Sequence, residues 1–76
     1  MIDLPPMSVP VKRSVTIDGH RTSVSLEDEF WTQLRQIASR RSMSLGALIA
    51  AIDHGRPPQV GLATALRLFV LDTLRR

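Results

Sequence analysis

The residues best suited to bind a partner lie in one alternating stretch, Arg21-Thr22-Ser23-Val24-Ser25-Leu26. Successive side chains of a β-strand point to opposite faces, so Arg21, Ser23 and Ser25 share one face. That face carries a guanidinium beside two hydroxyls, and guanidinium groups pair bidentately with phosphates and with guanine edges. The opposite face is largely apolar and suits a protein core. The stretch therefore predicts a strand that presents hydrogen-bond donors to an anionic groove.

Residues for catalysis or metal binding are sparse. The chain has no Cys and two histidines, His20 and His54, which are too few ligands for a zinc site. Asp53 precedes His54, but neighbours in a helix point in different directions and no nucleophile accompanies them. His20 is expected to be a hydrogen-bonded packing residue opposite Ile17. We therefore expect no enzyme, no metal and no cofactor.

The size and charge of the chain favour a small domain that associates. Its 76 residues make one domain, and a chain this short buries only about 60% of its unfolded surface. Without Cys it has no disulfide to stabilise it, so we expect oligomerisation to supply the missing buried surface. The net charge of +3 is modest, but nine of the ten cations are Arg. The positions of these cations are therefore more informative than their sum.

The first residues are predicted to form a flexible arm. We place this arm at residues 1–11 and the folded domain at residues 12–76. Pro5, Pro6 and Pro10 prevent regular pairing, and Asp3 is the only charge among the first ten residues. No secretory signal is recognisable. No stretch approaches the roughly 20 apolar residues of a membrane span. We expect a cytoplasmic protein without a membrane partner.

A β-hairpin is predicted before the first helix. Asp18-Gly19 lies between two alternating segments, 13–17 and 21–26, and suits a two-residue turn with positive φ at both positions. In the resulting register Ile17 faces His20. One face is then largely apolar, and the other is wholly polar. The polar face consists of Lys12, Ser14, Thr16, Arg21, Ser23 and Ser25.

Three helices are predicted after the hairpin. The first begins near Glu27 with three carboxylates at its positive end and has an apolar stripe of Phe30, Leu34, Ile37 and Ala38. The second runs from Leu45 to about His54, with Ser44 as its N-cap. The third runs from Leu62 to about Arg75. Its apolar face of Leu62, Leu66, Phe69, Val70 and Leu74 is flanked by Leu68 and Leu71, which predicts packing on two sides.

The order of these elements resembles the ribbon-helix-helix family of DNA-binding proteins. The resemblance rests on the strand 21–26, the first helical stripe and the turn Ser42-Met43-Ser44-Leu45. Residues 13–75 look like a bacterial subfamily with a Gly-His-Arg-Thr-Ser strand, here 19–23, and a Phe-Trp pair, here 30–31. The implied fold is mainly α with a short β-hairpin, a ribbon-helix-helix homodimer with an added C-terminal helix.

The resemblance also implies a DNA-binding surface. Two chains would pair their strands into a ribbon that enters the major groove, with Arg21, Ser23 and Ser25 at base-contacting positions. Lys12 lies on the same polar face. Ser44, with the backbone N–H groups of Leu45 and Gly46, falls on a phosphate anchor, and a helix N-terminus favours an anion in any case. The implied partners are a second copy and double-stranded DNA.

The extra strand 13–17 leaves alternatives open. If it flanks a central ribbon, the dimer has four strands and spans roughly 14 Å, whereas the major groove is about 12 Å wide. The strand could peel away, or the sheet could lie on phosphates, or the face could bind something else or remain solvated. We therefore predict a small transcriptional regulator with sequence-specific or semi-specific DNA binding. The alternative is a protein-interaction module, antitoxin-like or an adaptor, without DNA readout.

Overall fold

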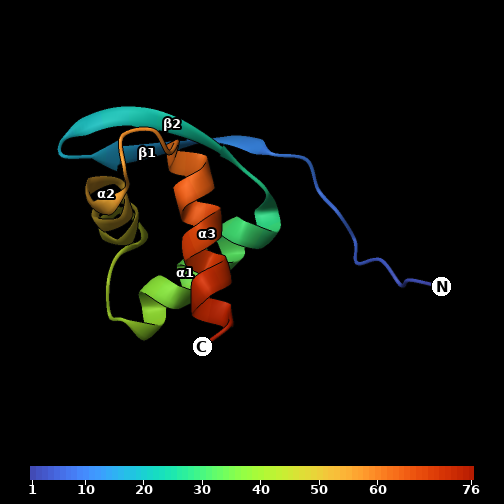
Figure 1. Cartoon of the computed structure of the whole chain (residues 1–76). Coiled ribbons are helices and arrows are strands. Elements are labelled where there is room, and N and C mark those ends of the chain that lie inside the picture. The colour runs from blue at the N-terminus through green and yellow to red at the C-terminus, as the bar shows by residue number, and fades with distance from the viewer.

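The computed structural model describes all 76 residues and consists of one β-hairpin followed by three helices. The strands are β1 (Val11–Ile17) and β2 (His20–Leu26), and the helices are α1 (Asp28–Arg40), α2 (Leu45–Gly55) and α3 (Leu62–Leu74). The hairpin lies across one end of the helical layer, and residues 1–10 extend away from it (Figure 1). The predicted fold class is confirmed for the single chain.

The hairpin has the predicted turn and register. Asp18 and Gly19 have φ values of 54° and 79°, as a tight turn between antiparallel strands requires. The seven pairs run from Ile17 opposite His20 to Val11 opposite Leu26. The first strand therefore begins at Val11, the last residue assigned to the arm, and pairs with β2 inside its own chain.

The two faces of the hairpin differ as predicted. Its inward side chains Val15, Ile17, Val24 and Leu26 are buried, and Leu26 is fully covered. They join the helices in one core of eleven buried residues, which contains no polar side chain. The helical members of this core are Leu34, Ile37, Ala38, Leu48, Ile49, Leu66 and Val70. The hairpin is thus fixed to the helices through its apolar face.

The connection between α1 and α2 is a tight reversal. Ser42 adopts a left-handed conformation with φ 56°. Its N–H donates to the carbonyl of Ser39, and the N–H of Met43 donates to that of Ala38. These two bonds satisfy the last carbonyls of α1 in a Schellman arrangement. Ser44 then caps α2, because its Oγ accepts the N–H of Ala47 at 3.1 Å.

Helix α3 packs against both other helices and β2. Arg67 donates to Glu27 at 2.9 Å and lies 5.9 Å from the centroid of the Phe30 ring, so it joins α3 to the start of α1. The predicted apolar face of α3 is correct for Leu66 and Val70, which are buried. It is wrong for Leu74, the last residue of α3, which is 56% exposed.

Candidate nucleic-acid interface

The outward face of the hairpin gathers the predicted site residues of the two strands. Lys12, Arg21, Ser23 and Ser25 are all exposed there. The register places Lys12 opposite Ser25 at one end and Arg21 opposite Thr16 at the other. At about 3.3 Å per residue these two rows are roughly 13 Å apart. The face therefore holds two cations at diagonal corners with hydroxyls between them.

The two outward cations have no acidic partner. No carboxylate lies on this face, and neither Lys12 nor Arg21 takes part in an ion pair. Four other arginines are bound to carboxylates: Arg13, Arg56, Arg67 and Arg76. Arg21 therefore keeps its guanidinium donors available for a phosphate or a base edge.

The predicted phosphate anchor lies at the start of α2. The Ser44 side chain is committed to its cap, but the N–H groups of Leu45 and Gly46 precede the first helical bond and have no partner in the chain. Ser44 and Gly46 are exposed, and Leu45 is half-buried. This helix end has the unpaired donors and the dipole that favour an anion.

The anchor adjoins β1. A hollow of about 280 Å³ lies between Leu45 and Gly46 of α2 and Ser14 and Thr16 of β1. Neither Ser14 nor Thr16 was among the predicted site residues, although the register had already placed both on the polar face. The hydroxyls of β1 thus lie between the start of α2 and the outward residues of β2. Arg21, Ser23 and Ser25 lie on the other strand and do not line this hollow.

The cation on the inward face of β1 has a structural role. Arg13 is only 16% exposed, and its guanidinium lies 4.9 Å from the centroid of the Trp31 ring. Its Nε donates to the carbonyl of Leu26 at 3.2 Å, and Nη2 donates to Asp28. A guanidinium can occupy this apolar face because its donors are satisfied and its plane covers an aromatic ring.

The two histidines differ in their contacts. The His20 side chain is exposed and forms no hydrogen bond, so the prediction of a hydrogen-bonded packing residue is wrong. It belongs to the closing pair of the turn, which lies at the far end of the hairpin from α1. The other histidine, His54, forms a hydrogen bond with the turn: its Nε2 lies 2.7 Å from Asp18 Oδ2. This hydrogen bond, with the nearby charge, raises the pKa of His54.

Two further carboxylates, those of Asp53 and Glu27, form ion pairs with arginines. Asp53 binds Arg56 at 2.9 Å rather than its neighbour His54. The bond from Arg67 is the main cause of a lowered pKa at Glu27.

No group of three His, Cys, Asp or Glu side chains lies close enough to hold a metal ion. No helix is both long and apolar enough to cross a membrane.

The family match covers nearly the whole chain. Residues 10–74 match the family model described as a ribbon-helix-helix domain. The chain belongs to the ribbon-helix-helix family. No curated protein and no solved structure matches it. The matched range includes β1 and α3, so both are part of this ribbon-helix-helix domain. The family match also supports a DNA-binding or regulatory fold.

Proposed function

We propose that this ribbon-helix-helix protein is a small bacterial transcriptional regulator that binds double-stranded DNA as a cytoplasmic homodimer. The observation that carries the proposal is the outward face of the hairpin. It presents Lys12 and Arg21 without any carboxylate, and Ser23 and Ser25 lie beside them on the same face. Such a face attracts phosphate and can donate to base edges.

The dimer contact in this proposal is the free edge of β2. The sheet has two strands, and no further strand covers that edge. An uncovered edge carries unpaired N–H and C=O groups that suit a second strand. Two copies of β2 would then pair antiparallel, with β1 on each outer side.

The position of β1 determines how such a dimer meets DNA. Because β1 pairs with β2 in the same chain, a dimer joined at β2 has four strands. Its backbone width of about 14 Å exceeds the roughly 12 Å of the major groove. We propose that the sheet lies over the groove and contacts phosphates at its borders through Lys12 and the α2 anchor of Ser44, Leu45 and Gly46. Arg21, Ser23 and Ser25 lie nearer the dyad and reach the base edges, which gives semi-specific binding.

Salt dependence of DNA affinity tests this proposal. Two copies of Lys12 would neutralise two phosphates, which gives a slope of log affinity against log salt of about −1.8. In Lys12→Ala these contacts are lost and the slope falls towards zero, whereas Arg21→Ala, which removes a contact with a base edge, lowers the affinity with little change in slope. Fluorescence anisotropy with a labelled duplex measures both values. Arg35→Ala is the matched control, because Arg35 is exposed on α1 and forms no ion pair.

A triple substitution gives the decisive result. Arg21→Ala, Ser23→Ala and Ser25→Ala together change only exposed side chains, so we expect the circular dichroism spectrum to be retained. Unchanged DNA affinity in that variant would exclude the hairpin face as the DNA-binding surface.

The second candidate is a protein-interaction module of the same fold, an antitoxin-like protein or an adaptor. The observation that favours it is a wide apolar groove between α2 and α3. A folded dimer that fails to retard duplex DNA at low salt would support this candidate over DNA binding.

A further inference from the structure

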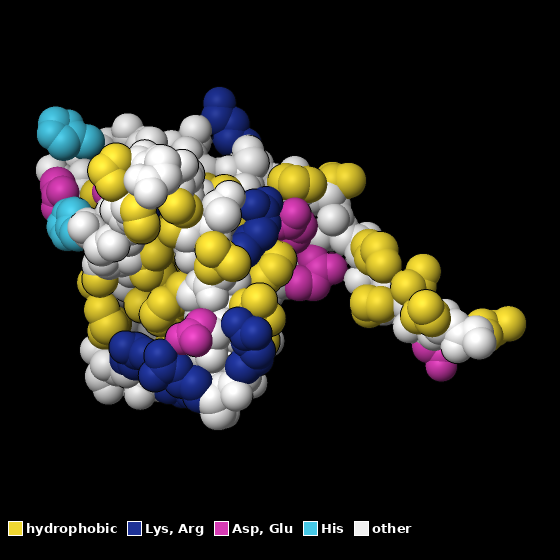
Figure 2. All heavy atoms as spheres, viewed as in Figure 1, with side chains coloured by type: hydrophobic (Ala, Val, Ile, Leu, Met, Phe, Trp, Pro, Cys, Tyr) yellow, Lys and Arg dark blue, Asp and Glu magenta, His cyan; other side chains and the backbone are white.

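The exposed large apolar side chains fall into two groups. One group lies at the start of the chain and consists of Met1, Ile2, Leu4, Met7, Val9 and Val11, and the other lies on α3 and consists of Leu68, Leu71 and Leu74. Except for Val11, which belongs to β1, the first group projects from the body as a separate arm, as the hydrophobic spheres of Figure 2 show. Ile2 and Leu4 are 82% and 72% exposed, so their own chain leaves them mostly uncovered.

The arm is suited to an apolar partner rather than to DNA. Asp3 is the only charged side chain in residues 1–10, so the arm has no side-chain cation to neutralise phosphates. Pro5, Pro6 and Pro10 exclude sheet pairing and favour the extended polyproline conformation. Segments of this kind bind in apolar grooves at a low entropic cost, because they are already extended.

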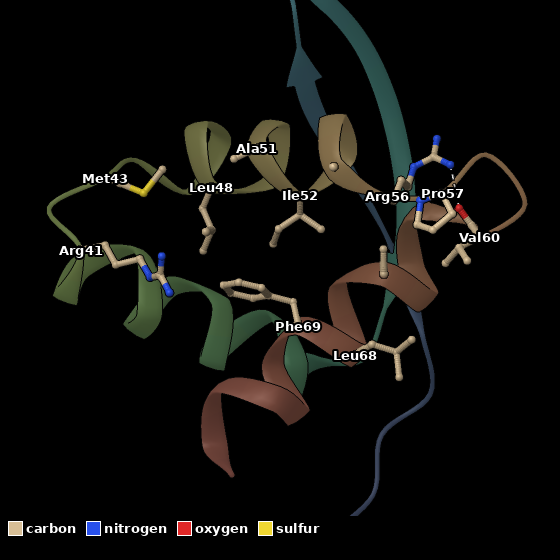
Figure 3. Close-up of a pocket in the computed structure, with 12 residues that line it drawn as sticks. Arg41, Met43, Leu48, Ala51, Ile52, Arg56, Pro57, Val60, Leu68 and Phe69 are labelled. Atoms are coloured by element: carbon tan, nitrogen blue, oxygen red, sulfur yellow. Dashed lines mark hydrogen bonds between the residues drawn. The ribbon is translucent and has the colours of Figure 1, made fainter. Parts of the chain in front are cut away.

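The groove between α2 and α3 has a matching composition. Its volume is about 580 Å³, and Leu48, Ile52 and Phe69 face one another across it (Figure 3). Arg41 and Arg56 lie at its opposite ends. Arg56 is bound to Asp53, but Arg41 has no carboxylate partner and lies 5.5 Å from the centroid of the Phe69 ring. The groove therefore offers an apolar floor with one unpaired cation.

The arm is held away from the groove of its own chain. Ser8 Oγ donates to Glu29 at 2.5 Å and accepts from the N–H of Asp28 at 3.3 Å, which fixes the arm at the start of α1. Arg41 follows the other end of α1, about 20 Å away at 1.5 Å per residue. The backbone from Asp3 to Ser8 spans at most about 17 Å. An anchored arm is therefore shorter than the helix that it would have to pass.

We propose that the arm of one copy lies in the α2–α3 groove of a second copy. Ile2 and Leu4 cover its apolar floor, and Asp3 pairs with Arg41. Exchange of identical segments is a low-cost route to a dimer. The contact is additional to DNA binding and does not depend on it. Each buried Leu or Ile strengthens self-association about ten- to a hundredfold.

Paramagnetic labelling tests the placement of the arm directly. Because the chain has no Cys, Pro5→Cys provides a single attachment site for a spin label and leaves Ile2, Asp3 and Leu4 in place. The labelled, NMR-silent chain is unfolded and refolded with wild-type chain carrying ¹³C-labelled methyl groups. Signal loss then reports contacts between copies. We expect losses at Leu48, Ile52 and Leu68, and none of these when the label is carried by Ser23→Cys on the outward face.

The arm exchange would be overturned by the same loss pattern from both label positions, or by no loss in the groove. A second sample, in which one chain carries both the spin label and the ¹³C and is diluted into unlabelled chain, tests the alternative. Groove loss in that sample alone would place the arm in its own groove and would also overturn the exchange.

A charge exchange tests the polar contact by sedimentation. We expect Asp3→Arg and Arg41→Asp each to weaken self-association up to about fivefold, the upper range for an exposed ion pair. We expect the double variant to recover it. Arg40→Asp is the control for general charge effects, because Arg40 is exposed and does not line the groove. A double variant weaker than both single variants would show that Asp3 and Arg41 do not meet.

Discussion

Replacing Arg13 by Met removes the one guanidinium that the hairpin directs towards the helices. Met retains much of the apolar stem, so the change isolates the polar and aromatic contacts of the head group. These contacts are the bond to the Leu26 carbonyl, the pair with Asp28 and the position over Trp31. Together they join β1, the end of β2 and the first turn of α1.

The expected loss of stability follows from these contacts. A hydrogen bond to a charged group contributes about 1.5–3 kcal/mol. A partly desolvated cation–π contact contributes about 0.5–2 kcal/mol. Because the contacts share one group and Asp28 is 68% exposed, we expect a total of about 2–3 kcal/mol rather than the full sum. A domain of this size has about 4–11 kcal/mol in all. The melting temperature should therefore fall by roughly 8–24 °C.

Thermal unfolding at a fixed protein concentration measures this loss, by circular dichroism and by the fluorescence of Trp31, the single Trp. Arg13→Lys should recover less than half of it, because an ammonium lacks the planar fork. Arg35→Met is the control on the exposed side of α1 and should stay within about 0.5 kcal/mol of wild type. If Arg13→Met matched this control, β1 would not be held against α1 as the structure shows.

The link between the turn and α2 should depend on pH. The pKa of His54 is raised in the folded chain by Asp18, so the stabilisation is complete below the unfolded value of 6.5 and is lost as pH rises through the folded value. Melting temperatures from pH 5 to 9 should therefore fall more steeply in wild type than in Asp18→Asn, and parallel curves would contradict the pairing. Ser44→Ala should lower stability by about 1 kcal/mol, measured by urea unfolding, because the N–H of Ala47 loses its acceptor. Ser44→Asp, which retains an acceptor, should recover most of that loss, and equal losses in both variants would argue against the cap.

The sequence alone determined the elements and the faces of the hairpin. Asp18-Gly19 requires a two-residue turn, and this turn fixes every cross-strand pair up to Val11 and Leu26. Since strand side chains alternate with a period of two, the same pairing separates the outward hydroxyls from the inward Val and Leu side chains. The start of α2 was also determined by the local sequence, because Ser44 Oγ accepts the N–H of Ala47, only three residues further along the chain.

Only the tertiary structure decided which distant groups meet. His54 and Asp18 are 36 residues apart, and Arg67 and Glu27 are 40 residues apart. Periodicity shows which face of an element is apolar, but it does not show how far one helix extends past another. The packing of the elements leaves Leu74 and His20 exposed and opens the groove between α2 and α3. These features depend on the relative positions of whole elements, which no local pattern of residues specifies.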